Sequence, residues 1–151
     1  MDQIRSWLYI GNYRDTCNLP SLQDRHIGAM LQLAELVEQP DIEVLYLPVE
    51  DGEPLLIDLL IQGIEFVCSQ KALGNIVLVA CGAGISRSSS FALAVLKEEE
   101  NLNLMDALRE IAKHHSDTQP HPALWASLCA YYGEEIDYLD VLDLLDEIKR
   151  L

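Results

Sequence analysis

The chain has 151 residues, a length that suits one domain, and half of them are hydrophobic, which provides for a sizeable core. Its 25 acidic and 10 basic side chains give a net charge of −15 with neutral histidines, so we expect no binding to nucleic acid or to membranes. No segment resembles a signal peptide or approaches the roughly 20 apolar residues of a membrane span, so a cytoplasmic protein is expected.

The hydrophobic pattern and the turn residues predict strands and helices that alternate along the chain. In chain order we expect strand 7–10, helix 18–25, strands 27–34 and 44–49, helix 55–73, strand 76–80, helix 88–99, a helix capped by Asn103, a helix from 120–122 to 132, and helix 137–150. Strand 76–80 is nearly all apolar, which is typical of a central strand buried on both faces. This order indicates an α/β fold with a central, mostly parallel sheet.

Residues 1–151 are expected to form a single domain, in which residues 134–151 are a C-terminal helical extension. The last predicted helix is amphipathic. We expect its apolar side to consist of Leu139, Leu142, Leu145 and Ile148.

The four cysteines form no CxxC pair, which argues against a zinc ribbon and against a thioredoxin-type motif. A chain of this size with so few cysteines does not need disulfides, so we expect reduced thiols. Three of the four, Cys17, Cys68 and Cys129, are expected to be small buried hydrophobic residues.

The fourth cysteine opens the segment CGAGISRS, residues 81–88, between the central strand and a predicted helix. Ligands of open α/β sheets bind at the carboxyl ends of the strands, where this segment lies. Gly82 and Gly84 can take positive φ, and their neighbours are small, so successive amides can point inward and form an anion nest to which the helix start adds its positive end. The expected phosphate-binding residues are Gly82, Ala83, Gly84, Ile85, Ser86 and Arg87.

The ends of this loop carry groups that suit phosphoryl transfer. The guanidinium of Arg87 offers two adjacent donors to phosphate oxygens. Near an arginine and a helix N-terminus, the Cys81 thiol is expected to ionise and to attack phosphorus in line, which gives a cysteinyl-phosphate intermediate. Ser88 either donates a hydrogen bond to this sulfur or only caps the helix, and both roles can coexist.

The loop resembles the C-x5-R signature of the cysteine-dependent protein tyrosine phosphatases, and AG-x-SRS is closest to the dual-specificity branch. WLYIGNYRDT is similar to that branch's first strand and turn. YLPVEDGEP resembles the strand and loop that carry its general acid, and DALREIAKHHSDTQPHPALWASLCAYY resembles the helix pair after the signature loop.

This resemblance implies that Asp51, in PVED, is the general acid that protonates the leaving group and later activates water. It implies neither a metal nor a cofactor, because loop amides and Arg87 stabilise the transition-state charge. An acidic, solvated loop without a catalytic role is the alternative interpretation of Asp51, because other carboxylates surround it.

One residue departs from the family pattern. The family usually has histidine immediately before the nucleophile, and this chain has Ala80. We therefore expect an active enzyme whose Cys81 ionises less readily than the cysteine of histidine-bearing relatives.

The expected function is hydrolysis of phosphotyrosine in a protein or peptide substrate, either alone or together with phosphoserine and phosphothreonine. A non-catalytic phosphoprotein-binding module and a phosphatase of a non-protein phosphomonoester are the alternatives. The loop interior lacks lysine and arginine, which disfavours a multiply phosphorylated lipid. Neither G-K-[ST] nor GxGxxG is present, which argues against a nucleotide loop.

The histidines of the C-terminal half were considered as metal ligands. His114 and His115 lie at the end of a predicted helix, whose C-terminus they are expected to contact, and His121 lies between two prolines. None has a glutamate partner at zincin spacing, so no metal site is expected from them.

Overall fold

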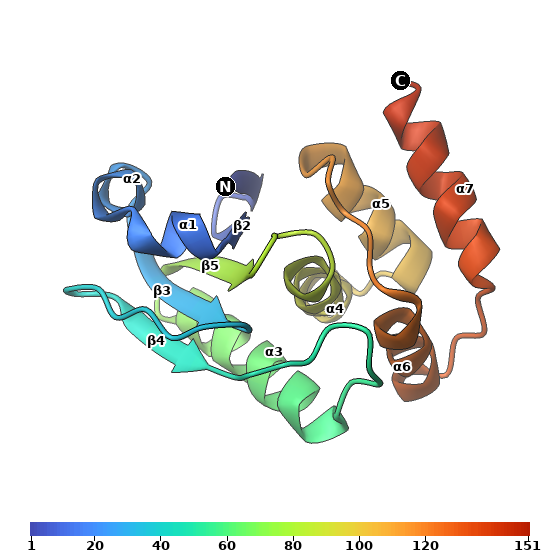
Figure 1. Ribbon diagram of the computed structural model, residues 1–151, viewed down its shortest axis with the longest axis horizontal. Coiled ribbons are helices and arrows are strands. Elements are labelled where there is room, and N and C mark those ends of the chain that lie inside the picture. The colour runs from blue at the N-terminus through green and yellow to red at the C-terminus, as the bar shows by residue number, and fades with distance from the viewer.

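The computed structural model describes all 151 residues and contains a five-stranded sheet with helices on both faces (Figure 1). The elements are β1 (Asp2–Arg5), β2 (Leu8–Asn12), α1 (Tyr13–Cys17), α2 (Leu19–Asp24), β3 (Ile27–Gln32), β4 (Glu43–Tyr46), α3 (Ile57–Ala72), β5 (Ile76–Cys81), α4 (Arg87–Glu100), α5 (Leu104–His114), α6 (Pro122–Tyr132) and α7 (Tyr138–Lys149).

The strand order is β1-β2-β5-β3-β4, with β5 in the centre. β5 pairs in parallel with β2 and with β3, β4 pairs in parallel with β3, and only β1 runs antiparallel to its neighbour. The expected α/β fold with a mostly parallel sheet is confirmed, and the central place of the apolar strand is as expected. The antiparallel β1 at the edge makes the sheet a mixed one.

Two elements were not predicted from the sequence. β1 has the sequence DQIR and buries only Ile4, so it lacks the alternation that marks a strand. α1 has five residues, too few for a helical period to show, and a reciprocal capping box between Asn12 and Asp15 stabilises its start.

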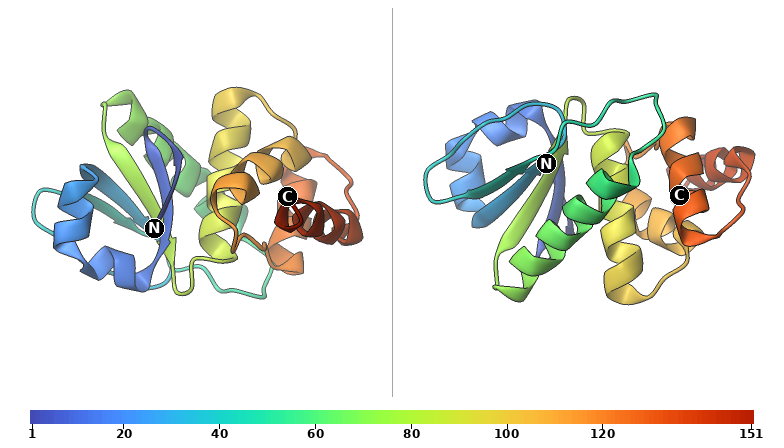
Figure 2. Two further views of the ribbon diagram at one scale, coloured as in Figure 1. Left: turned by 90° about the horizontal axis from the view of Figure 1, so that it is seen from above. Right: turned by 90° about the horizontal axis from the view of Figure 1, so that it is seen from below.

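The helices divide between the two faces of the sheet, as Figures 1 and 2 show. α1 and α2 cover one face, where a small cluster contains Leu78 and Ala80 of β5. α3 and α4 cover the other face, where Val77, Val79 and Cys81 belong to the main core cluster. Because side chains alternate along a strand, β5 directs the Cys81 thiol to the α4 side.

The last helix packs on the domain through a different stripe from the expected one. α7 contacts α5 and buries Val141, Leu144 and Leu145, whereas Leu139 is 65% exposed. The sequence-based choice of Leu139 was therefore wrong. Leucines and valines occur on more than one side of this helix, and only the packing against α5 selects among them.

No helix of this fold is both long enough and apolar enough to cross a membrane.

Candidate active site

The loop from Cys81 to Arg87 connects the end of the central strand with the start of α4. Gly84 has φ of 74°, and a Cβ atom there would lie 2.9 Å from the carbonyl oxygen of Gly11. Gly82 does not have positive φ, so that expectation was wrong for this residue. The absence of a side chain at Gly82 instead leaves room for the guanidinium, because a Cβ there would lie 3.1 Å from Nη2 of Arg87.

The Cys81 sulfur lies inside this turn and is almost completely buried. It accepts the backbone N–H of Gly84 at 3.2 Å and lies 3.2 Å from the Ser88 hydroxyl oxygen. Ser86, not Ser88, is the N-cap residue of α4, and no side chain caps this helix. The interpretation of Ser88 as the helix cap is therefore wrong, and its buried hydroxyl is directed to the sulfur.

Three backbone carbonyl groups of the Cys81–Arg87 loop are hydrogen-bonded to groups outside the loop. Tyr13 N–H donates to Gly82 O at 3.3 Å, Gln119 N–H donates to Ile85 O at 3.0 Å, and a ring nitrogen of His115 bonds Gly84 O. No peptide bond is cis, and in a trans peptide the N–H points opposite to the C=O. The amides that follow these carbonyls, those of residues 83, 85 and 86, are therefore directed to the inner side of the loop.

A second loop, residues 47–56 between β4 and α3, is fastened to the first. Arg87 Nη1 donates to Val49 O at 3.0 Å, and the Ser86 hydroxyl donates to Asp51 Oδ1 at 2.9 Å. The backbone N–H of His121 donates to the same Ser86 oxygen at 2.8 Å. The structure thus brings Asp51, Ser86 and Arg87 to one place, although Asp51 itself is exposed.

A cleft of about 300 Å³ adjoins this junction. Its lining includes Asp51, Ile85, Ser86, Gln119, His121 and Tyr138, so the β4–α3 loop, the Cys81–Arg87 loop and the start of α7 all contribute to it.

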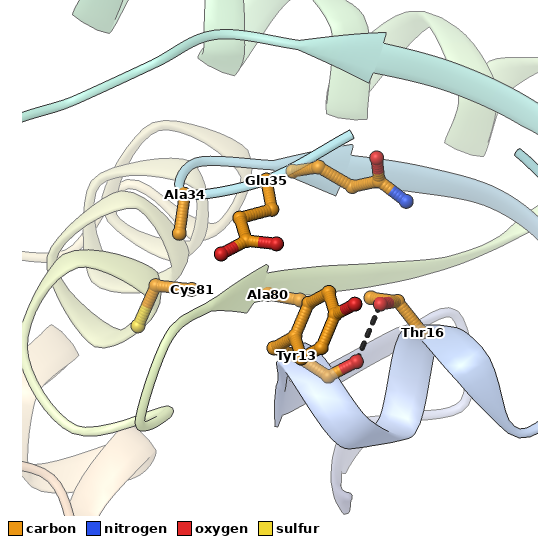
Figure 3. A pocket seen from close by; sticks show the side chains of 7 residues that line it. Tyr13, Thr16, Ala34, Glu35, Ala80 and Cys81 are labelled. Carbon is orange, nitrogen blue, oxygen red and sulfur yellow. Dashed lines mark hydrogen bonds between the residues drawn. The ribbon is translucent and has the colours of Figure 1, made fainter. Parts of the chain in front are cut away.

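A much smaller pocket of about 10 Å³, roughly the space of one water molecule, is lined in part by Ala80 and Cys81. Figure 3 shows side chains from α1, from β5 and from the segment after β3 around it, among them Tyr13, Ala80 and Glu35. The small side chain of Ala80 lies where most relatives are expected to have an imidazole.

The other cysteines do not all occupy the expected positions. Cys17 is exposed, which contradicts the expected burial, and Cys68 and Cys129 are half-buried. Burial, followed by the contact with Glu99, raises the pKa of the Cys68 thiol to about 12, and burial also raises the pKa of Cys129.

The three histidines serve different purposes. His114 is exposed at the end of α5, and the ring of His121 caps α6 by accepting the Ala123 N–H at 3.0 Å. His115 caps α5 only through its backbone, whereas its ring contacts Gly84 and Asp2, so the expected contact of its ring with the helix end was wrong. No three His, Cys, Asp or Glu side chains are grouped so as to hold a metal ion.

Residues 8–134 match the family model described as dual specificity phosphatase, catalytic domain. This chain belongs to the dual specificity phosphatase family. Human dual specificity protein phosphatase 16 is 30% identical over 137 residues, which are 87% of this chain and 19% of that protein. The probable dual specificity protein phosphatase H1 homolog of fowlpox virus is 33% identical over 104 residues, 68% of this chain and 63% of that protein. The chain thus spans less than two thirds of the length of either relative.

Solved structures of dual specificity phosphatases share the fold. A mouse putative dual specificity phosphatase complexed with zinc tungstate has a TM-score of 0.82 and 22% identity, covering 95% of this chain and 90% of that one. The human tyrosine phosphatase-like serine/threonine/tyrosine-interacting protein has a TM-score of 0.80 and 24% identity, covering 88% and 95%. At these identities the likeness concerns the fold.

Several residues of this dual specificity phosphatase site were not singled out from the sequence. Tyr13 and Gln119 hold the loop through their backbone N–H groups, for which residue type gives no signal. His115 was noticed as a helix-end residue, but its contacts come from segments far apart in the chain. The exposed side chain of Glu35 lines the pocket beside Cys81, and nothing local in the sequence indicates this.

Proposed function

We propose that this chain is a metal-independent, cysteine-dependent protein phosphatase that hydrolyses phosphotyrosine, and also phosphoserine or phosphothreonine, through a cysteinyl-phosphate intermediate. The observation that carries the proposal is the inside of the Cys81–Arg87 loop, where a buried sulfur lies among inward amides at the start of α4. Such a loop attracts a dianion and stabilises a thiolate at the same place.

In the first step, the Cys81 thiolate attacks the phosphorus of the bound monoester. The sulfur–phosphorus bond forms while the bond to the leaving oxygen breaks, and Asp51 gives its proton to that oxygen. Oδ1 of Asp51 already accepts a hydrogen bond from the Ser86 hydroxyl, so Oδ2 is the atom that carries the proton. Nη1 of Arg87 donates to the carbonyl oxygen of Val49. The two adjacent donors Nε and Nη2 therefore remain for phosphate oxygens.

In the second step, water attacks the phosphorus of the intermediate and Asp51, now a carboxylate, accepts a proton from that water. The new phosphorus–oxygen bond forms, the sulfur–phosphorus bond breaks, and inorganic phosphate leaves. The Ser88 hydroxyl lies 3.2 Å from the sulfur and donates to the thiolate as it departs, which makes the sulfur a better leaving group.

A phosphorylated protein or peptide is the proposed substrate class. The loop interior carries no basic side chain besides Arg87, and the chain is strongly acidic, so a multiply anionic lipid headgroup would be repelled. The cleft beside the loop offers space for a group next to the phosphorylated side chain.

The test is phosphate release from an aryl phosphate, a phosphotyrosine peptide and a phosphothreonine peptide, with Cys81→Ser as the control. We expect release by the unmodified chain, none by Cys81→Ser, and no effect of a chelator. Binding of phosphopeptide without release above background would instead make the chain a binding module. Faster release from a lipid or nucleotide than from any peptide would favour the non-protein substrate.

A further inference from the structure

The ring of His115 bridges the N-terminal strand and the Cys81–Arg87 loop. Its Nδ1 lies 2.6 Å from Oδ2 of Asp2, and its Nε2 lies 2.5 Å from the carbonyl oxygen of Gly84. The ring is nearly buried, with 7% of the side chain exposed, whereas the Asp2 side chain is 51% exposed.

Both partners of the ring are hydrogen-bond acceptors. A backbone carbonyl can only accept, and a carboxylate also only accepts. A neutral imidazole has one N–H and can satisfy one of these partners, whereas the imidazolium has two and satisfies both. The imidazolium is therefore the form of the ring that can donate to both partners.

The carbonyl that His115 holds belongs to the peptide between Gly84 and Ile85. With this carbonyl fixed outward, the Ile85 N–H is fixed inward, toward the space for the phosphoryl group. Positive φ at Gly84 places this peptide in a conformation that glycine adopts but does not enforce, because glycine has many alternatives. The other two held carbonyls accept backbone N–H groups, so His115 provides the only titratable contact of the three.

We propose that His115 is a positioning residue for oxyanion binding: its imidazolium, oriented by Asp2, holds the Gly84 carbonyl outward and so keeps the Ile85 amide directed at the phosphoryl group. This inference rests on the proposed function, because the oxyanion that the loop is built to take is the substrate phosphate. We call the Asp2–His115–Gly84 contact the clasp.

The other ionisable groups near the clasp are exposed, paired elsewhere or part of the loop itself. They are Arg5 on β1, paired with Glu100 and Glu110; the amino group of Met1, paired with Asp15; Lys113 and His114 on α5; Asp117 after α5; and Cys81 and Arg87 in the loop. Asp2 is the one carboxylate in contact with the ring, so it is the partner to change.

Binding of tungstate, a tetrahedral dianion, tests the clasp without turnover. At about pH 6.5, we expect His115→Gln to bind tungstate roughly tenfold more weakly than the unmodified chain, because a misdirected amide forfeits a hydrogen bond to a charged group. His114→Gln changes the exposed neighbouring histidine and is the matched control, expected to bind like the unmodified chain. Isothermal titration calorimetry measures all three. Equal affinity of the two glutamine variants would overturn the proposal.

The pH dependence separates a charged clasp from a merely structural histidine. The tenfold advantage of the unmodified chain over His115→Gln should disappear by about pH 9, where an imidazole is neutral. The two proteins differ only at residue 115, so the ratio of their affinities isolates the ring. His115→Arg should keep its advantage over His115→Gln at every pH, and Asp2→Asn should bind tungstate more weakly than the unmodified chain at about pH 6.5. A ratio that does not change with pH contradicts the clasp.

The ring nitrogens can also be observed directly by ¹⁵N NMR. We expect both nitrogens of His115 to be protonated at about pH 6.5, and a neutral ring there would overturn the proposal.

If tungstate binding depends on His115 as expected but no substrate releases phosphate, the phosphatase proposal fails and the clasp stands. If phosphate is released but His115→Gln behaves like His114→Gln, the clasp fails and the phosphatase proposal stands.

Discussion

Gly84 combines two constraints at a single position, a backbone conformation and a close contact. Its φ of 74° is costly for any residue with a Cβ, and the added atom would lie 2.9 Å from the carbonyl oxygen of Gly11. Gly74 shares the first constraint, with φ of 84°, but has open space around its would-be Cβ. Alanine at Gly74 therefore measures the cost of backbone strain alone, whereas alanine at Gly84 measures that cost together with the cost of displacing the loop.

For Gly84→Ala we expect a loss of about 2 kcal/mol or more in the free energy of unfolding and a large fall in kcat/KM, because the loop must shift away from β2. Gly74→Ala should lose only about 1 kcal/mol, with unchanged kcat/KM. Urea denaturation and hydrolysis of an aryl phosphate measure both quantities. Equal activity of the two variants would show that the observed loop conformation is not required.

Ala80 stands where the family resemblance leads us to expect histidine, and its surroundings permit a direct test. The neighbouring pocket of about 10 Å³ is too small for an imidazole, but Tyr13 and Glu35, which line it, are exposed and can swing outward. For Ala80→His we expect severalfold faster alkylation of Cys81 by iodoacetate near pH 6, because a charged ring beside Glu35 stabilises the thiolate. Ala80→Gln, of similar size but neutral, is the control. Equal alkylation of the two variants would contradict the electrostatic explanation.

The thiols should differ strongly in reactivity. Cys68, with a pKa raised to about 12 by burial and by Glu99, stays protonated below that pH and is a poor nucleophile at pH 7 to 8. We expect brief treatment with iodoacetate at pH 7 to modify Cys81 before Cys68 and Cys129, as peptide mass mapping would reveal. Modification of Cys68 first would contradict the description of both sites.

At the scale of elements, the loop that carries Asp51 is positioned by the loop that carries the nucleophile. Two side chains of the Cys81–Arg87 loop reach it, Ser86 at Asp51 and Arg87 at Val49. Residues 47–56 have no regular structure, so hydrogen bonds position this loop. The N–H groups of Leu47 and Val49 bond the carbonyl oxygens of Gln32 and Leu33, and the Ser86 and Arg87 bonds join the loop directly to the proposed phosphate site.

For Asp51→Asn we expect a fall in kcat of about 10²-fold or more for alkyl phosphates and a small change for p-nitrophenyl phosphate, whose leaving group needs little help from an acid. Ser86→Ala should show the same dependence on leaving group with a smaller fall, since Asp51 remains but is less well placed. A linear free-energy plot of kcat against leaving-group pKa tests both. Parallel plots for Asp51→Asn and the unmodified chain would contradict the role of Asp51.

The same elements show how far the sequence alone could predict this molecule. Strand β5, the Cys81–Arg87 loop and helix α4 are contiguous in the sequence. Each has a local signal: the apolar run of the strand, the glycines of the loop and the helical spacing of α4. The placement of Cys81 between strand and helix could therefore be predicted. The antiparallel β1 was missed although its partner β2 is close in the sequence, because only Ile4 of this strand is buried. The clasp was missed because Asp2 and His115 are 113 positions apart. Local patterns carry no information on such contacts.

At the scale of the whole molecule, the C-terminal helix raises the question of where the domain ends. The family match ends at residue 134, and α7 lies beyond it. Yet Val141, Leu144 and Leu145 belong to the same core cluster as β5 and α4, and Tyr138 hydroxyl donates to Pro120 O beside the cleft next to Asp51. We propose that residues 1–151 form one folding unit, in which α7 supports both the core and one wall of that cleft.

A comparison of a buried and an exposed leucine of α7 tests this proposal. Leu144 is 4% exposed in the core, and its replacement by alanine should cost about 2–5 kcal/mol of unfolding free energy. Leu139, five residues earlier in the same helix, is 65% exposed, so Leu139→Ala should change the unfolding free energy by less than about 0.5 kcal/mol. Urea denaturation followed by tryptophan fluorescence measures both, since Trp125 lies in the same cluster. A single transition shifted only by Leu144→Ala is expected of one folding unit, whereas equal transitions for both variants would mean that α7 is an appendage.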